Sequence, residues 1–312
     1  MSPLRSLAAA FCLSATVPLT AQAKALQVVA TIPELVDIVQ RVGGDLVSVR
    51  GIARGPEDIH QVVMRPSFVT KLNQADAVVY MGLGLEDSFL PPLLSVAANP
   101  KMRADEVKLC AGEACIDCSD GVKVLEKPES LSRAEGDIHP QGNPHYNLDP
   151  SDGVLIARNI ASGLSRIDPG HRGDYQRNLK AYLDELEPKV ALWRKAAAPL
   201  KGVKAVSYHK DVAYLARFTG IDFIDAVELK PGVAATPKHL EALVKKMREQ
   251  EVKLIVRERH FEPKTCDWLA EQTGATVAVI GAMAKALPKT DTFIGFSEQN
   301  LKALLGAMGK AD

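Results

Sequence analysis

The sequence has no excess of charge of either sign, because 38 Lys and Arg residues are balanced by 38 Asp and Glu residues. Proteins that bind nucleic acid or an anionic membrane surface usually gather a positive field, and this composition does not supply one. We therefore expect no nucleic-acid partner and no attachment to membranes through a basic patch.

Long apolar runs are missing from the body of the chain as well. A transmembrane helix needs roughly 20 consecutive apolar residues, and no segment after residue 25 approaches that length. We therefore expect no direct membrane insertion.

The first 25 residues have the composition of an export signal. Arg5 precedes a short apolar stretch, Leu7–Leu19, and small residues follow at Ala21 and Ala23. This order of charge, apolar run and small residues predicts a signal peptide over 1–25. Cys12 follows Phe11, which is too large for a lipoprotein cleavage site. We predict a protein exported in soluble form to a bacterial periplasm.

Cysteine is scarce, and four cysteines remain after residue 25: Cys110, Cys115, Cys118 and Cys266. In an oxidising compartment an even number of cysteines predicts disulfides. Cys115 and Cys118 form a C-x-x-C pair, but the sequence has no second such pair to complete a zinc site and no thioredoxin-like surroundings. We predict a structural disulfide within residues 110–118, whose pairing the spacing leaves open.

The remaining pattern alternates apolar, β-branched segments with amphipathic ones, which predicts an α/β fold with right-handed crossovers. We expect two open α/β lobes, over residues 26–167 and 200–312, joined by one long rigid helix over 168–199, with a cleft between the lobes. The strands that support this prediction are Leu26–Ile32, Leu46–Ile52, Ala77–Met81, Ala205–Tyr208, Leu254–Val256 and Thr276–Ile280.

The long helix is predicted from apolar residues that recur every three or four positions after Asp168 and Pro169. Pro188 interrupts this pattern and is expected to kink the helix or to mark a short break in it. A helix of this length spans about 45 Å and limits the lobes to small relative movements. Residues 100–144 break the alternation of strands and helices, so we expect this excursion to be the moving part.

Histidine is also rare, with seven residues, yet three of them occupy similar positions. His209 follows an apolar strand, His60 lies in the loop after another, and His145 lies in the turn-rich segment GNPHYNLDP. Ligands in open α/β sheets bind outside the carboxyl ends of the strands. Neutral imidazole is a common ligand of transition metals, so these three residues are candidates for one metal site between the lobes.

The sequence around these histidines resembles that of the zinc- and manganese-binding solute-binding proteins of ABC importers, the TroA-like and ZnuA-like family. The resemblance covers Leu26 to Met308. It rests on the segments GPEDIHQVVMRPSFVTKLNQADAVVYMGLGLED, NPHYNLDP, VSYHKDVAYLARFTGI and PGVAATPKHLEAL.

This resemblance implies that His60, His145 and His209 are metal ligands. The family often has a fourth ligand, an aspartate shortly after the strand that matches Thr276–Ile280, but here the chain runs into Gly281, Ala282 and Met283. Our first choice for the fourth ligand is Glu258, at the end of another strand, where a residue that supports an imidazole is the alternative. Weaker candidates are Asp291, His260 and a water molecule, and His139 is interpreted as a solvated histidine in preference to an extra loop ligand.

Three imidazoles with at most one carboxylate favour Zn²⁺ over Mn²⁺ and Fe²⁺. The function implied is a monomeric periplasmic protein that binds zinc with high affinity and delivers it to an ABC-type permease. We do not expect an enzyme, because the sequence has no HExxH motif. The alternatives are a periplasmic zinc hydrolase, a metal-dependent adhesin and a metallochaperone.

Overall fold

The computed structural model describes residues 24–106, 108–128, 139–228 and 233–309. The predicted signal peptide therefore lies almost entirely outside the described residues. Within them, no helix is both long enough and apolar enough to cross a membrane.

The N-terminal lobe is built on a four-stranded parallel sheet with the order β2-β1-β3-β6. Its β-branched central strands are buried, as expected of a sheet that is covered by helices on both faces. The strands are β1 (Leu26–Ala30), β2 (Val47–Gly51), β3 (Ala77–Tyr80) and β6 (Cys115–Asp117), and the helices are α1 (Pro33–Gly43), α2 (Pro66–Asn73), α3 (Leu90–Ala97) and α4 (Asp152–Ile167).

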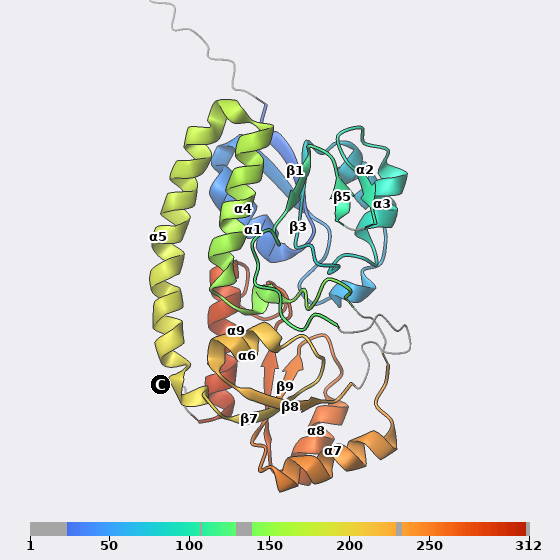
Figure 1. The fold of residues 1–312 in the computed structure, drawn as a ribbon, viewed down its shortest axis with the longest axis vertical. Helices are drawn as coiled ribbons and strands as arrows, with labels where there is room; N and C mark the ends of the chain where they lie inside the picture. The colour runs from blue at the N-terminus through green and yellow to red at the C-terminus, as the bar shows by residue number, and fades with distance from the viewer. Residues whose placement is uncertain (1–23, 107, 129–138, 229–232, 310–312) are drawn as a thin grey trace, which may run out of the picture.

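The C-terminal lobe repeats this plan with a parallel sheet of order β10-β9-β7-β8. Its strands are β7 (Lys204–Ser207), β8 (Asp222–Ala226), β9 (Leu254–Glu258) and β10 (Thr276–Ile280), and its helices are α6 (Ala213–Thr219), α7 (Pro237–Glu249), α8 (Lys264–Thr273) and α9 (Phe293–Ala307). Figure 1 shows the two sheets one above the other.

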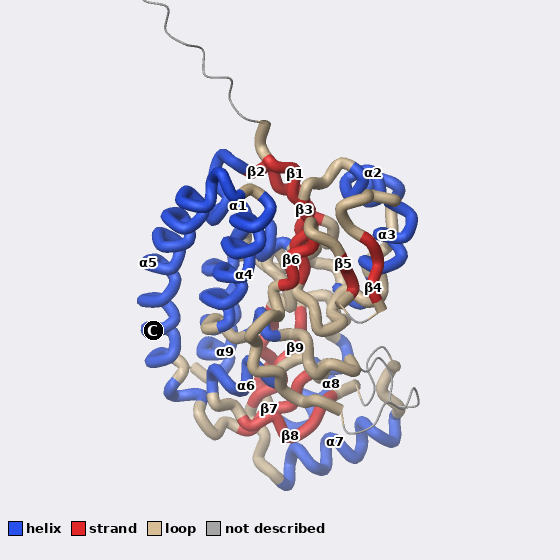
Figure 2. Tube along the Cα trace, turned by 45° about the horizontal axis from the view of Figure 1, so that its top comes forward, coloured by secondary structure: helices blue, strands red, loops and turns tan. Residues whose placement is uncertain are grey.

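Alternate residues of the second sheet face two different cores, because side chains alternate across a strand. Ala205 and Leu254 belong to the main core, which runs through both lobes, whereas Val206 and Ile255 belong to a smaller core with residues of α7 and α8. Helices α7 and α8 therefore cover the face of the sheet opposite the main core (Figure 2).

Helix α5 (Arg172–Ala196) runs along one side of both lobes, which confirms the predicted fold class (Figure 1). Its 25 residues span about 38 Å, and it continues through Pro188. Buried residues such as Tyr175, Leu186 and Trp193 pack it onto the main core. The lobe boundaries predicted from the sequence stay a prediction.

Polar contacts also join segments of the two lobes. The Asp37 carboxylate on α1 accepts a hydrogen bond from the backbone N–H of Phe293, at the start of α9. Arg217 on α6 donates to Asp149 and Asp152, at 2.8 and 2.5 Å, from the opposite lobe. These contacts restrict relative movement of the lobes, in addition to the restriction by α5.

The excursion at residues 100–144 is partly regular. It contains a small antiparallel pair, β4 (Arg103–Asp105) and β5 (Leu109–Ala111), and then adds β6 to the first sheet. A disulfide joins Cys110 to Cys115, so a disulfide does form within residues 110–118, while Cys118 and Cys266 are buried thiols. The predicted mobility of this excursion stays a prediction, and residues 129–138 lie outside the described part.

Candidate metal site

The three predicted histidines converge between the lobes. The ligand atoms of His60, His145 and His209 all lie within 4.8 Å of one another, and Nε2 of His60 lies 3.3 Å from Nε2 of His145. Two nitrogen ligands of a tetrahedral zinc ion, each about 2.0–2.1 Å from the metal, are separated by about 3.3 Å. The spacing of this pair therefore matches two corners of a zinc tetrahedron.

Local structure fixes each of these side chains. His60 lies in a short 3-10 turn (Ile59–Gln61), where the carboxylate of Asp58 accepts a hydrogen bond from its backbone N–H at 2.9 Å. The backbone N–H of His145 donates to the side-chain oxygen of Asn143 at 3.0 Å. His209 follows β7 at its carboxyl end. His145 and His209 are buried, at 5% and 8% exposure.

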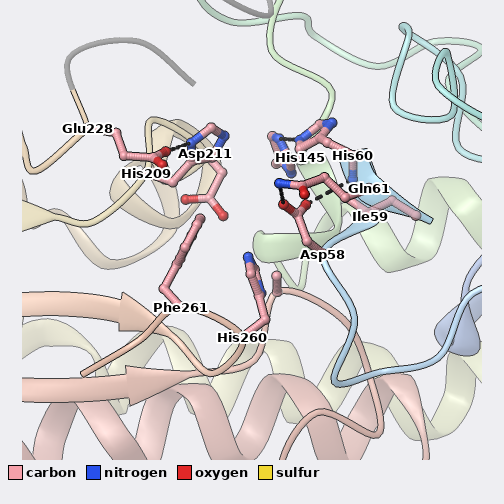
Figure 3. Close-up of a pocket in the computed structure, with 11 residues that line it drawn as sticks. Asp58, Ile59, His60, Gln61, His145, His209, Asp211, Glu228, His260 and Phe261 are labelled. Carbon is pink, nitrogen blue, oxygen red and sulfur yellow. Dashed lines mark hydrogen bonds and ion pairs between the residues drawn. The ribbon is translucent and has the colours of Figure 1, made fainter. Parts of the chain in front are cut away.

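His209 is oriented by a carboxylate that the sequence prediction missed. Oε2 of Glu228 lies 2.9 Å from Nδ1 of His209, which leaves Nε2 of that ring for a metal ion (Figure 3). A carboxylate in contact with the second ring nitrogen of a histidine ligand is typical of metal sites. Glu228 follows β8, a strand that the sequence prediction also missed. The sequence feature that could have identified Glu228 is its position just after the end of a strand.

The surroundings shift the pKa values of the buried imidazoles in different directions. Burial lowers the pKa of His145 well below its ordinary value, and His60 and His209 lower it further, so that this ring is neutral at neutral pH. Burial also lowers the pKa of His209, but the hydrogen bond to Glu228 and the nearby Asp211 carboxylate outweigh it, and the net pKa is raised. His209 therefore binds a proton more readily than His145 does.

Glu258, the predicted fourth ligand, is not part of the histidine cluster. It is fully buried at the end of β9 and does not line the pocket beside the histidines. Burial raises its pKa well above the ordinary value, and the adjacent Asp211 carboxylate raises it further. The alternative role predicted for Glu258 was to support an imidazole. For His209, that contact is made by Glu228 instead.

The structure separates the other candidates for the fourth ligand by whether they line the pocket. His260 lines the pocket, whereas Asp291 is exposed and does not line it. At the family's usual aspartate position, Gly281 donates its N–H to Asn300, and Ala282 is the residue that lines the pocket. No carboxylate therefore reaches the pocket from the segment after β10 within the described residues.

His139 is not the freely solvated side chain that we predicted. Its ring centroid lies 5.2 Å from that of His60 and 6.1 Å from that of His145. Burial and the neighbouring His60 and His209 lower its pKa to about 3. The correction has a simple physical reason, because the chain after residue 138 returns across the site on its way to His145.

The pocket itself is small, with a volume of about 40 Å³. A single water molecule needs at least about 10–15 Å³ measured in this way, so the pocket suits an ion with one or two waters. Sequence reasoning did not find three acidic residues of this pocket, Asp58, Asp211 and Glu228. Its full lining is Asp58, Ile59, His60, Gln61, His145, His209, Asp211, Glu228, His260, Phe261 and Ala282.

The chain resembles known proteins over nearly its full length. A family model described as the periplasmic component A of a zinc-uptake complex, ZnuA, matches residues 28–307. The metal ABC transporter substrate-binding lipoprotein SloC of Streptococcus mutans is 26% identical over 292 residues, which cover 92% of this chain and 91% of SloC. The manganese ABC transporter substrate-binding lipoprotein PsaA of Streptococcus pneumoniae is 23% identical over 296 residues, with 93% and 92% covered.

Solved structures share the fold. A crystal structure of ZnuA matches with a TM-score of 0.73 and 27% identity, covering 92% of this chain and 99% of that one. A manganese-bound periplasmic metal binding protein from Candidatus Liberibacter asiaticus matches with a TM-score of 0.72 and 18% identity, covering 90% and 98%. At that identity the second likeness supports the fold alone.

Proposed function

This chain belongs to the ZnuA family of periplasmic zinc-uptake components, and from that premise we propose that it captures zinc and delivers it to the membrane permease of an ABC importer. Members of this family are metal-binding components of ABC transporters, not enzymes, in agreement with the resemblance described above. The observation that carries the proposal is the buried cluster of His60, His145 and His209, whose ligand atoms lie within 4.8 Å.

Zinc is the proposed ion because the cluster consists of nitrogen ligands. Zinc is commonly held by three imidazoles, whereas Mn²⁺ prefers carboxylate, carbonyl and water oxygens. The relative PsaA is named for manganese, and the family model is named for zinc, so Mn²⁺ and Fe²⁺ are the competitors to test. The first measurement is a calorimetric titration of the metal-free protein with Zn²⁺ and with Mn²⁺. Tighter binding of Mn²⁺ would contradict the choice of zinc.

The size of the pocket favours binding of an ion over hydrolysis of an organic substrate. A volume of about 40 Å³ suits an ion with one or two waters. Turnover of a generic ester or peptide by the zinc-loaded protein, lost on chelation, would favour the zinc hydrolase instead.

We propose that the protein acts as a monomer in the periplasm after removal of residues 1–25. The relatives SloC and PsaA are named as lipoproteins, so anchoring through Cys12 is the competing arrangement. The mass of the protein isolated from its natural host separates the two. A free chain that starts near Lys24 or Leu26 is expected, and a lipid-modified chain that starts at Cys12 would contradict it.

Delivery to a permease is tested in cells. A strain that lacks the gene should need more zinc than its parent in a chelator-treated medium, and the intact gene should restore growth. A variant with His145→Ala should not restore it, whereas His171→Ala, a change in a surface residue outside the pocket, should. Restoration by the His145 variant would show that zinc delivery does not need this site.

A further inference from the structure

A fourth histidine lies beside the three that form the cluster. The ring centroid of His139 lies 5.2 Å from that of His60 and 6.1 Å from that of His145. The ring centroid of His209, a member of the cluster, lies 5.8 and 5.9 Å from the same two rings. His139 is therefore about as close to this pair of rings as His209 is.

The spacing of the rings is close to the spacing that one tetrahedral ion imposes. Imidazole nitrogens about 2.0–2.1 Å from a tetrahedral zinc ion place the ring centroids about 5.2 Å apart. The centroids of His60 and His145 are 5.2 Å apart, as are those of His60 and His139. His209 is also near enough to His139 to lower its pKa. The four rings therefore surround one point.

Gly84 holds the His139 ring in the way that metal-binding histidines are usually held. Its backbone accepts a hydrogen bond from the ring, and Nδ1 is the ring nitrogen on that side. A Cβ atom on residue 84 would lie 3.2 Å from this Nδ1, so the absence of a side chain gives the ring room. Histidine ligands almost always donate their second ring N–H to a carboxylate or a backbone carbonyl. The contact leaves Nε2 of His139 for an ion.

The carboxylates that line the pocket are engaged with other groups in the described part of the chain. Both oxygens of Asp58 accept hydrogen bonds within its own turn, each at 2.9 Å. Glu228 contacts Nδ1 of His209, and Asp211 shares a hydrogen bond with the side chain of Glu258. A buried charge needs opposite charge nearby, and these groups supply it to a dication without being its ligands.

We propose that His139 is the fourth ligand of the metal ion and completes a site of four imidazoles. His139 is outside the group whose ligand atoms all lie within 4.8 Å of one another, so its ring moves inward when the ion binds. The movement is small, because its centroid is already within about 1 Å of the tetrahedral spacing from His60 and from His145. Four nitrogen ligands favour zinc over manganese. This inference rests on the proposed function, because it concerns the same ion.

His260 is the competing histidine. It lines the pocket, where Figure 3 shows it next to Asp58, and its ring packs on Phe261 with centroids 4.2 Å apart. Asp58 and Asp211 are the charged groups that act on it most strongly. His260 therefore faces carboxylates, whereas His139 faces the rings of the cluster.

The inference is tested by NMR of the protein loaded with a magnetically active isotope of cadmium. Such a spectrum shows a through-bond correlation between the ion and the ring protons of each imidazole that binds it. We expect correlations to four imidazoles in the parent protein and in His171→Ala, and to three in His139→Ala. Three imidazoles in the parent, all retained in His139→Ala, would overturn the assignment. The loss of one imidazole in His260→Ala, with none lost in His139→Ala, would overturn it as well.

Calorimetric titration with Zn²⁺ gives a second measurement. His139→Ala should weaken Zn²⁺ binding by at least roughly the 10- to 100-fold that loss of a supporting residue causes, and an affinity equal to that of the parent would refute the fourth ligand. The cadmium spectrum of the parent needs no variant, so it stays decisive if His139→Ala does not fold. A parent that binds neither Zn²⁺ nor cadmium would refute the proposed function, whereas a parent that binds through three imidazoles would refute only the role of His139.

Discussion

Oε2 of Glu228 lies 2.9 Å from Nδ1 of His209, in a contact that is buried on both sides. It fixes which nitrogen of His209 faces the metal, and it places a negative charge on the far side of that ring from the ion. This pair joins the end of β7 to the end of β8, two neighbouring strands of one sheet. The geometry of the site is therefore supported by the sheet itself as well as by the histidine ligands.

Removal of this support should weaken metal binding without abolishing it. Glu228→Gln is expected to lower Zn²⁺ affinity roughly 10- to 100-fold, the effect typical of residues that orient a histidine ligand. Calorimetric titration of the metal-free protein measures this directly. The matched control is Asp168→Ala, which breaks a similar contact, Asp168 with His171, at a distance from the pocket. An affinity of Glu228→Gln equal to that of the control would show that the contact is dispensable.

Metal binding should weaken as the pH falls, and His209 should set the range. Its pKa is raised above the ordinary value near 6.5, so the metal-free protein takes up a proton there as the pH falls through a value above 6.5. That proton must leave before zinc binds. His145, whose pKa is lowered, stays neutral through this range and does not compete.

The test is the Zn²⁺ affinity measured as a function of pH for the parent protein and for Glu228→Gln. Loss of the carboxylate removes the main influence that raises the pKa of His209, so the midpoint of the proton-competition step should move to lower pH. The fall of affinity should therefore begin at lower pH in the variant. A fall that begins at the same pH in both proteins would contradict this assignment.

Glu34 links the first lobe to the segments that carry the site. Its two carboxyl oxygens accept hydrogen bonds from the side chain of Asn147 at 2.7 Å and from the backbone N–H of Ala284 at 3.1 Å, in a fully buried position. Glu34→Ala leaves both donors unpaired, at about 1–3 kcal/mol each, so the free energy of unfolding should fall by about 2–6 kcal/mol. Denaturant unfolding measures this change.

The control for Glu34 is Glu185→Ala, which removes an exposed ion pair with Arg41 and should change stability by no more than about 1 kcal/mol. Burial also raises the pKa of Glu34 to about 7, so the folded protein holds this proton more tightly than the unfolded chain does. The contribution of this group to stability is therefore lost as the pH rises towards and through about 7. A loss of stability by Glu34→Ala no greater than that of the control would contradict the role of Glu34.

Placing a carboxylate at the family's usual position should strengthen Zn²⁺ binding. Ala282 lines the pocket, and its backbone oxygen is held by Asn147 at 2.9 Å. Ala282→Asp is expected to raise the Zn²⁺ affinity roughly tenfold or more, because it places a further negative charge beside the ion. Ala191→Asp, a change at an exposed position of α5, is the matched control and is not expected to raise it. Equal affinities of these two variants would argue against a role for a carboxylate at this position.

Much of the fold was predictable because its strands and helices have strong local signals. The β-branched run at Thr276–Ile280 and the capped amphipathic helix at Pro237–Glu249 have the predicted bounds. The strand β8 was missed because its sequence, DFIDA, alternates with acidic residues instead of forming an apolar run. The short strand β6 was missed because it lies in a segment rich in cysteine and charge.

The candidate site was predictable only in part, for a related reason. Histidines are rare enough that three at strand ends or in tight loops stand out, so His60, His145 and His209 were identified from the sequence. Acidic residues are common, and nothing in the sequence separates a buried Asp211 or Glu228 from the exposed Asp291. Which carboxylate meets the pocket depends on the packing of segments that are far apart in the chain.

Metal binding at the histidine cluster is tested most directly by a calorimetric titration of the mature, metal-free protein with Zn²⁺. The variants His60→Ala, His145→Ala and His209→Ala are compared with the parent and with His171→Ala. We predict one tight equivalent of zinc for the parent and for His171→Ala, and affinity lower by orders of magnitude for each variant of the cluster. If all three variants bind one equivalent of zinc as tightly as the parent, the metal is not held at this site and the account is wrong.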